Sequence, residues 1–255
     1  MWSVARNAFR EAVRDRVLYN LVLFVLLLTV AAIFVGAASA SQDAKIIVDL
    51  GLSAMLLFGA FIAVFVGVGL VSKEIERRTL YVIFAKPVGR GEFLLGKYLG
   101  LCLTLAVNVA VMGAGVALAL LYVTRGDTSL AARLWPAVSL IFMELTILTG
   151  VALLFSSFSS PIMSTFAAVA VFVIGHLSPD IKAFAEILGS APATVALGTL
   201  YYVLPNLSTY SFITPAAYGV MPPLGHVMGA LGYTVLYDAV LLAAAALVFS
   251  KRDFK

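Results

Sequence analysis

Two carboxylates near the centres of long apolar runs are the first residues in this chain that could do chemistry. They are Glu144 and Asp238. An ionised carboxylate in the middle of a bilayer costs on the order of a few kcal/mol, so such residues usually face a partner or a wet cavity. Asn108, in a third apolar run, could pair with either of them. The three residues could line a translocation path or the seam between two copies, relay protons, or hold helices together by hydrogen bonding.

Other motifs give little support for catalysis or for a bound cofactor. Gly91 to Lys97 reads G-x-x-x-x-G-K, but Tyr98 follows where a phosphate-binding loop needs Ser or Thr, and no strand precedes it. Cys102 is the single cysteine, which excludes a disulfide framework or a C-x-x-C metal site. His176 and His226 are about fifty residues apart, and we expect them at a membrane interface rather than in a metal site. No nucleophile motif is present, so we expect a chain that is not an enzyme and binds no metal.

The composition predicts an integral membrane protein. Of 255 residues, 62% are hydrophobic and 12% are charged, about half the charged share of an average globular domain. Lipid forces every backbone polar group to pair internally, and the continuous apolar runs are typical of helices rather than barrel strands. A spanning helix needs ~20 apolar residues. We therefore predict an all-α fold, a single membrane domain over 1–255, with six transmembrane spans at 17–38, 46–72, 95–123, 134–155, 162–177 and 224–249.

The distribution of basic residues predicts the orientation. If the N-terminus is cytoplasmic, thirteen of the seventeen Lys and Arg residues lie on the inner side. This is the asymmetry of the positive-inside rule, and it places both termini in the cytoplasm. The net charge of +4 then reflects topology, and we expect no nucleic-acid partner. The apolar stretch 184–204 is interrupted by Gly and Pro, so we interpret it as an external or re-entrant helix.

Two charged amphipathic segments flank the early spans. Arg6, Arg10 and Arg14 recur every fourth residue, which suits an interfacial helix with its cations toward anionic lipid. The longest inner loop, 73–97, contains a short helical pattern in which Leu80, Ile83 and Phe84 share one face. Glu74 precedes Arg78 by four residues, a stabilising pair, and Pro87 ends the pattern. The loop is either a docking surface held under the membrane or a solvated loop that satisfies the positive-inside rule.

Motifs in and beyond this loop resemble the permeases of the type-2 exporter family of ABC transporters. The residues that carry the resemblance are Glu74-x-Glu76-x-x-Thr79, Lys86-Pro87-Val88-x-Arg90, Leu95-Gly96-Lys97, and the basic end Phe249-Ser250-Lys251-Arg252-Asp253-Phe254. Leu204-Pro205-Asn206-Leu207 resembles an outer-loop motif of one branch, which includes the permease associated with maturation of a copper enzyme, nitrous oxide reductase. In one departure from the pattern, Arg78 stands where the family usually has Gly.

The resemblance implies six spans, an N-terminal interfacial helix, a cytoplasmic coupling helix between spans two and three, and external helices between spans five and six. It also implies a working unit of two permeases and two separate cytoplasmic ATPases, with ATP and Mg²⁺ on the ATPases only. The residues it assigns to coupling are Glu74, Glu76, Arg77, Arg78, Thr79, Leu80, Ile83, Phe84 and Pro87. The resemblance further implies an exporter in a prokaryotic cytoplasmic membrane, in contact with membrane lipid. Some members of the family serve an extracytoplasmic partner, which is therefore possible here.

In an alternative hypothesis, the chain transports its substrate without an ATPase. Glu144 and Asp238 are placed where a proton- or ion-coupled secondary transporter would carry its coupling groups. In that case the chain alone would move its substrate in response to a pH gradient, and Glu144→Gln would abolish transport. The identity of the substrate is left open by either hypothesis.

Overall fold

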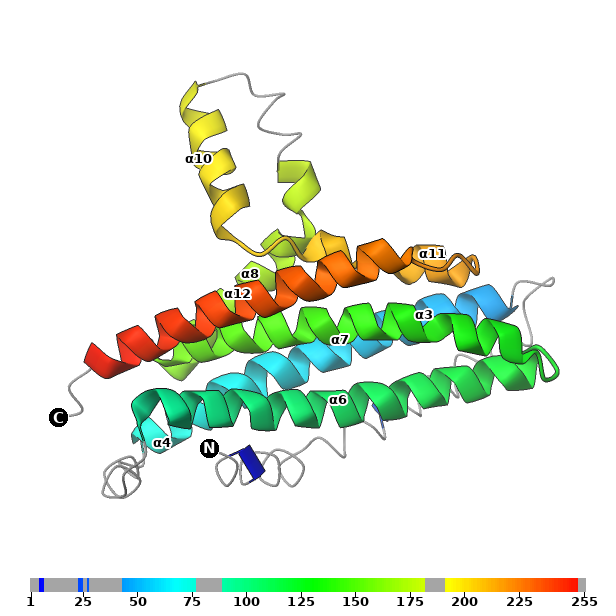
Figure 1. Ribbon diagram of the computed structural model, residues 1–255, viewed down its shortest axis with the longest axis horizontal. Helices are drawn as coiled ribbons and strands as arrows, with labels where there is room; N and C mark the ends of the chain where they lie inside the picture. Colours follow the sequence, from blue (N-terminus) through cyan, green and yellow to red (C-terminus); the bar gives the residue numbers. More distant parts are fainter. Residues whose placement is uncertain are drawn as a thin grey trace.

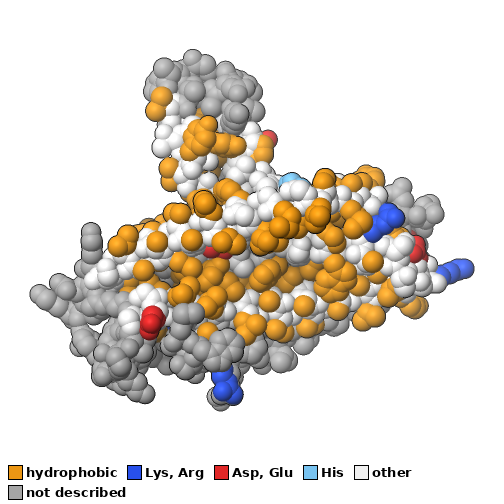
Figure 2. Space-filling view, in the orientation of Figure 1, with side chains coloured by type: hydrophobic (Ala, Val, Ile, Leu, Met, Phe, Trp, Pro, Cys, Tyr) orange, Lys and Arg blue, Asp and Glu red, His pale blue; other side chains and the backbone are white. Residues whose placement is uncertain are grey.

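The computed structural model describes residues 43–76, 89–181 and 191–251, together with residues 5, 6, 23, 24 and 27. Every regular element within these residues is helical. The long helices lie side by side along one axis and form an elongated bundle (Figure 1). Hydrophobic side chains cover most of the face of this bundle that Figure 2 presents. The all-α character predicted from the continuous apolar runs is confirmed for this part of the chain.

Three consecutive helical segments form the first rod of the bundle. These are α3 (Asp43–Phe61), the π-helical turn η2 (Ile62–Val66) and α4 (Gly67–Glu76). The remaining long helices are α6 (Arg90–Val123), α7 (Thr128–Ser156), α8 (Pro161–His176) and α12 (Leu224–Lys251). Three shorter helices, α10 (Ala191–Val203), η3 (Leu207–Tyr210) and α11 (Ile213–Ala217), lie between α8 and α12.

The tight turns between helices have local causes. After α6 the chain reverses through Arg125 and Gly126, which have φ angles of 56° and 98°. Asp127 then caps α7 by accepting a hydrogen bond from the Ser129 backbone N–H. Its hydrogen bonds to Ser129 keep the pKa of the Asp127 carboxyl below its ordinary value. At the other end, α8 begins with Pro161, whose fixed φ suits the first helical position.

Within the part of the chain that the structure describes, four helices are long and apolar enough to cross a membrane. They cover Asp43–Ser72, Gly91–Val123, Thr128–Ser156 and Leu224–Ser250, and they overlap the predicted spans at 46–72, 95–123, 134–155 and 224–249. The predicted span at 162–177 lies in α8, an apolar helix of 16 residues, shorter than the ~20 that a bilayer core requires. The predicted span at 17–38 lies outside the described residues except for residues 23, 24 and 27. The count of six spans therefore stays a prediction.

Helix α7 is the centre of the bundle. It packs against α6, α12, α8, α3 and α4, and it buries apolar side chains around its whole circumference, including Leu140, Leu145 and Leu148. A helix that is apolar all round belongs in a core rather than at a surface. By contrast, α12 leaves a row of large apolar side chains exposed, which suits lipid or another apolar surface: Leu231, Val235, Leu236, Val240 and Leu247.

The chain leaves the bundle after α8 and returns before α12. Figure 1 shows α10 (yellow) standing away from the long helices at a steep angle. The chain then runs back along α12 through η3 to α11, which packs against α3. The described part of the predicted 184–204 helix, residues 191–203, is helical. Its external or re-entrant position in a membrane stays a prediction.

Close packing between α3 and α7 depends on a glycine. A methyl group at Gly59 would collide with the side chain of Leu145, which is fully buried on α7. We expect Gly59→Ala to lower the free energy of unfolding by about 1–3 kcal/mol, the usual cost of overpacking a core. Thermal unfolding of the purified protein in detergent measures this effect.

The matched control is Gly229→Ala on α12. Gly229 has no neighbouring atom within 4 Å of the position its Cβ would occupy, so the added methyl group should be neutral or slightly stabilising by helix propensity. Equal melting temperatures for the two variants would contradict the proposed α3–α7 contact.

Candidate functional site

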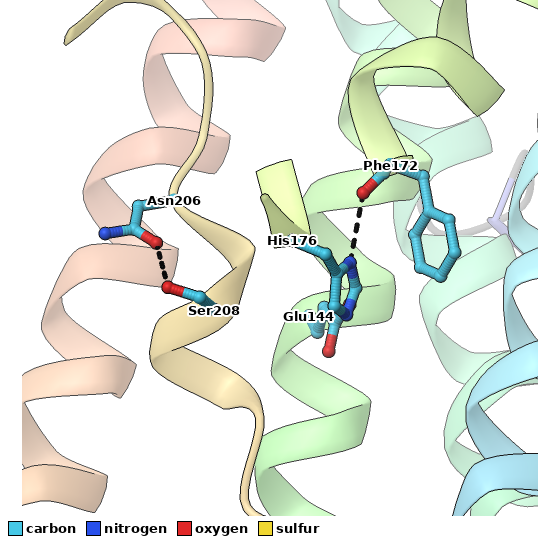
Figure 3. Close-up of polar contacts among 5 residues, drawn as sticks. All are labelled: Glu144, Phe172, His176, Asn206 and Ser208. Carbon is cyan, nitrogen blue, oxygen red and sulfur yellow. Dashed lines mark hydrogen bonds and ion pairs between the residues drawn. The ribbon is translucent and has the colours of Figure 1, made fainter. Parts of the chain in front are cut away.

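Glu144 of α7 faces the last residue of α8. Its Oε1 lies 3.2 Å from Nε2 of His176, which is the distance of an ion pair (Figure 3). Glu144 is only 1% exposed, whereas the His176 side chain is 26% exposed. The other ring nitrogen, Nδ1, lies 3.0 Å from the carbonyl oxygen of Phe172 one turn earlier. The structure thus gives the buried carboxylate a partner that sequence analysis missed, because it placed His176 at an interface.

Asp238 of α12 has a different partner. The hydroxyl of Tyr98, on α6, donates a hydrogen bond of 2.6 Å to Asp238 Oδ2, and both side chains are buried. Asp238 Oδ1 lies against Gly150 of α7, where a methyl group would be 3.3 Å away. This oxygen has no hydrogen-bond partner among the described residues. Asp238 therefore lies at the junction of α6, α7 and α12.

Asn108 bonds within its own helix. Its Nδ2 donates to the Thr104 carbonyl at 2.8 Å, and its side chain is buried. No hydrogen bond joins Asn108 to Glu144 or Asp238 among the described contacts. The three polar residues singled out from the sequence therefore do not form one hydrogen-bonded cluster. Glu144 is paired with a residue of α8, Asp238 with a residue of α6, and Asn108 with the backbone of its own helix. Each placement is consistent with a role in helix packing.

A short return segment, residues 203–210, is tied to α12 by side chains. Tyr210 bonds the Thr234 hydroxyl and donates to the Ala230 carbonyl at 3.3 Å. The backbone N–H of Asn206 donates to the Tyr233 hydroxyl, and Tyr237 donates to the Val203 carbonyl. In the first turn of α12, His226 Nε2 forms a hydrogen bond of 2.9 Å with the carbonyl oxygen of Thr209. These contacts order a segment that has only four residues of regular helix.

The same return segment packs on the end of α8 beside His176. A methyl group at Gly175 would lie 2.7 Å from Leu207 Cγ and 2.8 Å from the Pro205 carbonyl oxygen. Only a residue without Cβ allows so close an approach. Within the segment, Ser208 donates a hydrogen bond to Asn206 Oδ1 at 2.6 Å (Figure 3). Pro205 and Leu207 of the Leu204-Pro205-Asn206-Leu207 motif therefore pack directly against Gly175, the residue before His176.

An apolar groove of about 270 Å³ lies between α3–η2 and α8. Phe61 and Phe65, whose rings stack with centroids 5.7 Å apart, form part of one wall. Phe172 lines the opposite wall, and its ring also lies against the His176 ring at a centroid distance of 4.7 Å. All the side chains that line the groove are hydrocarbon: Leu57, Ala60, Phe61, Val64, Phe65, Val169, Phe172 and Val173. Such a groove suits an acyl chain or an apolar side chain.

The described residues contain no cluster of three or more His, Cys, Asp or Glu side chains that would hold a metal ion. Cys102 is a free cysteine on α6. The chemistry available in this part of the chain is thus hydrogen bonding and proton exchange at isolated buried groups, together with apolar contact.

The described ends of the predicted coupling loop, 73–97, lie in α4 and α6. Glu74 and Glu76 lie in the last turn of α4, and α6 begins at Arg90 after Gly89. Figure 1 shows the end of α4, the start of α6 and the end of α12 at the same end of the bundle. The other residues assigned to coupling lie outside the described residues: Arg77, Arg78, Thr79, Leu80, Ile83, Phe84 and Pro87.

A second hydrophobic cluster ties the helices together at this end. It is built from Val71 of α4, Phe93 and Leu94 of α6, Leu153 of α7, and Phe249 of α12. The rings of Phe93 and Phe249 stack with centroids 6.2 Å apart. The cluster therefore connects the facing ends of α4 and α6 to α7 and α12.

The comparisons with known proteins identify the family. The family model described as "ABC-2 family transporter protein" matches residues 2–254, which is nearly the whole chain. The chain belongs to this family. As an ABC-2 family protein it is a membrane transport protein and not itself an enzyme, as its sequence predicted. The resemblance to type-2 exporter permeases drawn from the loop motifs is confirmed.

Two curated relatives have the same printed name, "Probable ABC transporter permease protein NosY". The protein from Pseudomonas aeruginosa is 32% identical over 125 residues, and the one from Stutzerimonas stutzeri is 31% identical over 127 residues. Each match covers 48% of this chain and 46% of the relative, so the ABC-2 chain matches about half the length of each NosY protein. Both relatives are consistent with the copper-enzyme maturation branch that the motifs resemble.

The contact between α6 and α12 gives a test of the buried polar residues. Tyr98→Phe removes the hydroxyl that donates a hydrogen bond to Asp238 Oδ2. The buried carboxyl oxygen then has lost its hydrogen-bond donor. We expect this to cost about 1–3 kcal/mol of unfolding free energy, the penalty for an unsatisfied buried polar group. Unfolding in detergent, followed by intrinsic fluorescence, measures the loss.

Tyr122→Phe, on the same helix, is the matched control because Tyr122 is 86% exposed. It should unfold like the wild type. If Tyr98→Phe is equally neutral, the Tyr98–Asp238 bond does not hold α6 to α12.

Proposed function

We propose that this ABC-2 family chain is the permease subunit of an ATP-driven exporter, and that a separate cytoplasmic ATPase supplies its energy. The observation that carries the proposal is the position of the 73–97 segment. It joins two long helices, α4 and α6, at the end of the bundle where a hydrophobic cluster connects four helices. Its sequence carries the coupling motif of the family, with an apolar face of Leu80, Ile83 and Phe84. ATP and Mg²⁺ are expected on the ATPase alone.

The working unit proposed is two permease copies with two ATPases, in a prokaryotic cytoplasmic membrane. Residues 1–255 act as a single permease domain with six spans and both termini in the cytoplasm, as the positive-inside distribution favours. Exposed apolar rows on α12 and α8 give each copy surface for lipid or for the second copy. The relatives named NosY support a further proposal, that transport here serves a process or a partner on the outer side of the membrane.

Mechanical transmission through the bundle follows from the packing. Closure of the ATPase pair would push the coupling helix against the ends of α4 and α6. The force would pass to α7 and α12 through the second hydrophobic cluster, because close-packed side chains transmit strain. The residues of the cluster that connect these helices are Val71, Phe93, Leu153 and Phe249. The π-turn at Ile62–Val66 lies farther along the same rod, and such turns frequently occur at functional sites. Movement there would reshape the apolar groove between α3–η2 and α8, which suits an apolar substrate or a lipid chain.

The coupling surface can be tested by partner binding. Leu80→Asp combined with Phe84→Asp places two carboxylates on the face proposed to fill an apolar groove of the ATPase. Because burying an unpaired charge is strongly unfavourable, we expect co-purification with the ATPase to fall at least tenfold. Affinity purification of the tagged permease, with the ATPase band quantified, measures the loss.

The matched control adds two acids elsewhere, as Thr128→Asp with Ser129→Asp. These positions lie in the first turn of α7, where negative charge is tolerated by the helix dipole. The control should retain the ATPase. Full retention by the Leu80/Phe84 variant as well would exclude the coupling-helix assignment, while the family membership would stand.

The orientation can be tested by thiol labelling. In a Cys102→Ser background, Thr128→Cys probes the α6–α7 turn and Ser160→Cys probes the α7–α8 turn, both at exposed positions. A membrane-impermeant maleimide on intact cells should label position 128, and position 160 should react only after the cytoplasmic face is opened. The reverse pattern would place the 73–97 segment outside and remove its access to a cytoplasmic ATPase.

A further inference from the structure

The apolar groove between α3–η2 and α8 lies far from the charged ends of the first rod. The charged residues nearest to the lining residues Leu57 and Phe65 along this rod are Asp49 and Lys73, each eight residues away. Eight helical residues rise about 12 Å, so the groove lies near the middle of a rod that spans ~30 Å of hydrocarbon. The facing helix, α8, contains no Lys, Arg, Asp or Glu. In a membrane, the groove is therefore exposed to acyl chains rather than to water.

The groove has a floor and two rims that follow the helix axes. Ala60 and Val64 form the floor, because they line the groove and are only 7% and 2% exposed. Val169 and Val173, one turn apart on α8, stand half-exposed along one rim. The other rim consists of three half-exposed side chains that recur every fourth residue of the rod: Leu57, Phe61 and Phe65. The groove thus runs along the rod for about 12 Å, with a mean cross-section of about 20 Å².

The chemistry of the groove determines what can fill it. A water molecule in a protein interior needs roughly two to four polar partners, and every side chain that lines the groove is hydrocarbon. Apolar cavities of about 150 Å³ stay dry and take up apolar molecules, and this groove measures about 270 Å³. Side chains around an unfilled space lose their dispersion contacts on that side. The occupant that suits the groove is therefore an uncharged hydrocarbon.

Two protein occupants fit the groove less well than a single hydrocarbon chain. Phe24, in the predicted first span, packs edge-on against Phe58 and lies beside Gly115 of α6. Phe58 does not line the groove, so this part of the chain lies on another side of α3. A stable interface with a second copy involves roughly 20–30 residues from each partner, whereas eight side chains line the groove. A narrow groove along the helix axis has instead the direction of acyl chains in a bilayer.

We propose that the groove binds one acyl chain of a membrane lipid, whose headgroup stays at the bilayer surface. The chain packs on Ala60 and Val64 between the two rims and supplies the contact that the side chains of α3 and α8 do not make with each other. It lies against the π-helical turn η2, so it supports the rod where its hydrogen bonding departs from that of an α-helix. The site needs neither ATP nor an ATPase, and it is separate from the proposed coupling surface.

Photocrosslinking with a labelled lipid tests the site in the full-length protein. The protein is reconstituted in phosphatidylcholine bilayers that contain a trace of phosphatidylcholine with a diazirine on one acyl chain. It is then transferred into detergent and irradiated, because detergent replaces lipid on open surfaces and spares a chain held in a groove. Peptide mass spectrometry should find adducts on residues 57–65 and 169–173 several-fold more often than on the exposed face of α12, at Val235, Leu236 and Val240. Equal adduct frequencies at both places would show ordinary lipid contact only and would overturn the proposal.

Substitutions that fill the groove should exclude the chain. Ala60→Phe places a ring on the floor, and Leu57→Trp enlarges a rim residue that is 52% exposed. Each should lower the adducts on residues 169–173 several-fold. Because Leu57 lies outside the core, Leu57→Trp tests the site even if Ala60→Phe fails to fold. Val240→Phe, at a position of α12 with 58% exposure, is the matched control and should keep the wild-type adducts. Wild-type adduct levels in both folded groove variants would contradict the proposal.

Disulfide formation distinguishes the lipid from a second copy of the chain. In a Cys102→Ser background, Val169→Cys places a thiol on the α8 rim. With an acyl chain in the groove, oxidation in bilayers should give little covalent dimer. Efficient dimer formation, in bilayers where the wild type gives no adducts at the groove, would assign the groove to a second copy and refute lipid binding. These measurements require no ATPase, so their failure leaves the proposed function standing, and loss of the coupling surface leaves the lipid site standing.

Discussion

The interior of a membrane offers no water to a polar group, and the structure follows from that constraint. Each backbone N–H and C=O must pair within the protein, which leaves long helices as the structural units. The same constraint acts on the side chains. Glu144 and Asp238 each lie deep in the bundle, and each is bound by a residue from another helix, His176 of α8 and Tyr98 of α6. Polar pairs thus join α7 to α8 and α12 to α6, while apolar packing around α7 supplies the rest of the core.

The function proposed for this ABC-2 family chain requires the packed helices of the bundle to move together. The two ends of the described bundle differ in a way that suits this task. At the end where α4 stops and α6 starts, stacked aromatic rings and aliphatic side chains join four helices into one rigid cluster. Toward the other end, α8 stops at His176, and an irregular segment returns along α12 held by side-chain hydrogen bonds. Two backbone groups of this irregular segment, the Asn206 N–H and the Val203 carbonyl, are hydrogen-bonded by tyrosines of α12.

The motif residues 204–207 show how local sequence and tertiary packing combine. Pro205 ends the preceding helix and Leu207 begins a short 3₁₀ turn, and these features are local. Their packing against the end of α8 depends on Gly175, about thirty residues earlier, because only glycine lets the two segments approach so closely. The hypothesis of a secondary transporter used Glu144 and Asp238 as one proton relay. The structure gives each carboxyl group its own partner, His176 for Glu144 and Tyr98 for Asp238.

The sequence by itself determined the membrane class, the approximate limits of four long helices and the family. These properties depend on composition, on runs of about twenty apolar residues and on short motifs, all of which are contiguous in the chain. Only the tertiary structure decided which partner each buried polar residue has. Asn108, which could have paired with a carboxylate or served helix packing, bonds its own helix, and His176 lies 3.2 Å from Glu144, a contact that the sequence did not predict. The physical reason is that the contacts of a buried side chain depend on how each helix is rotated about its own axis and on where α8 ends. The local periodicity of the sequence does not specify either of these.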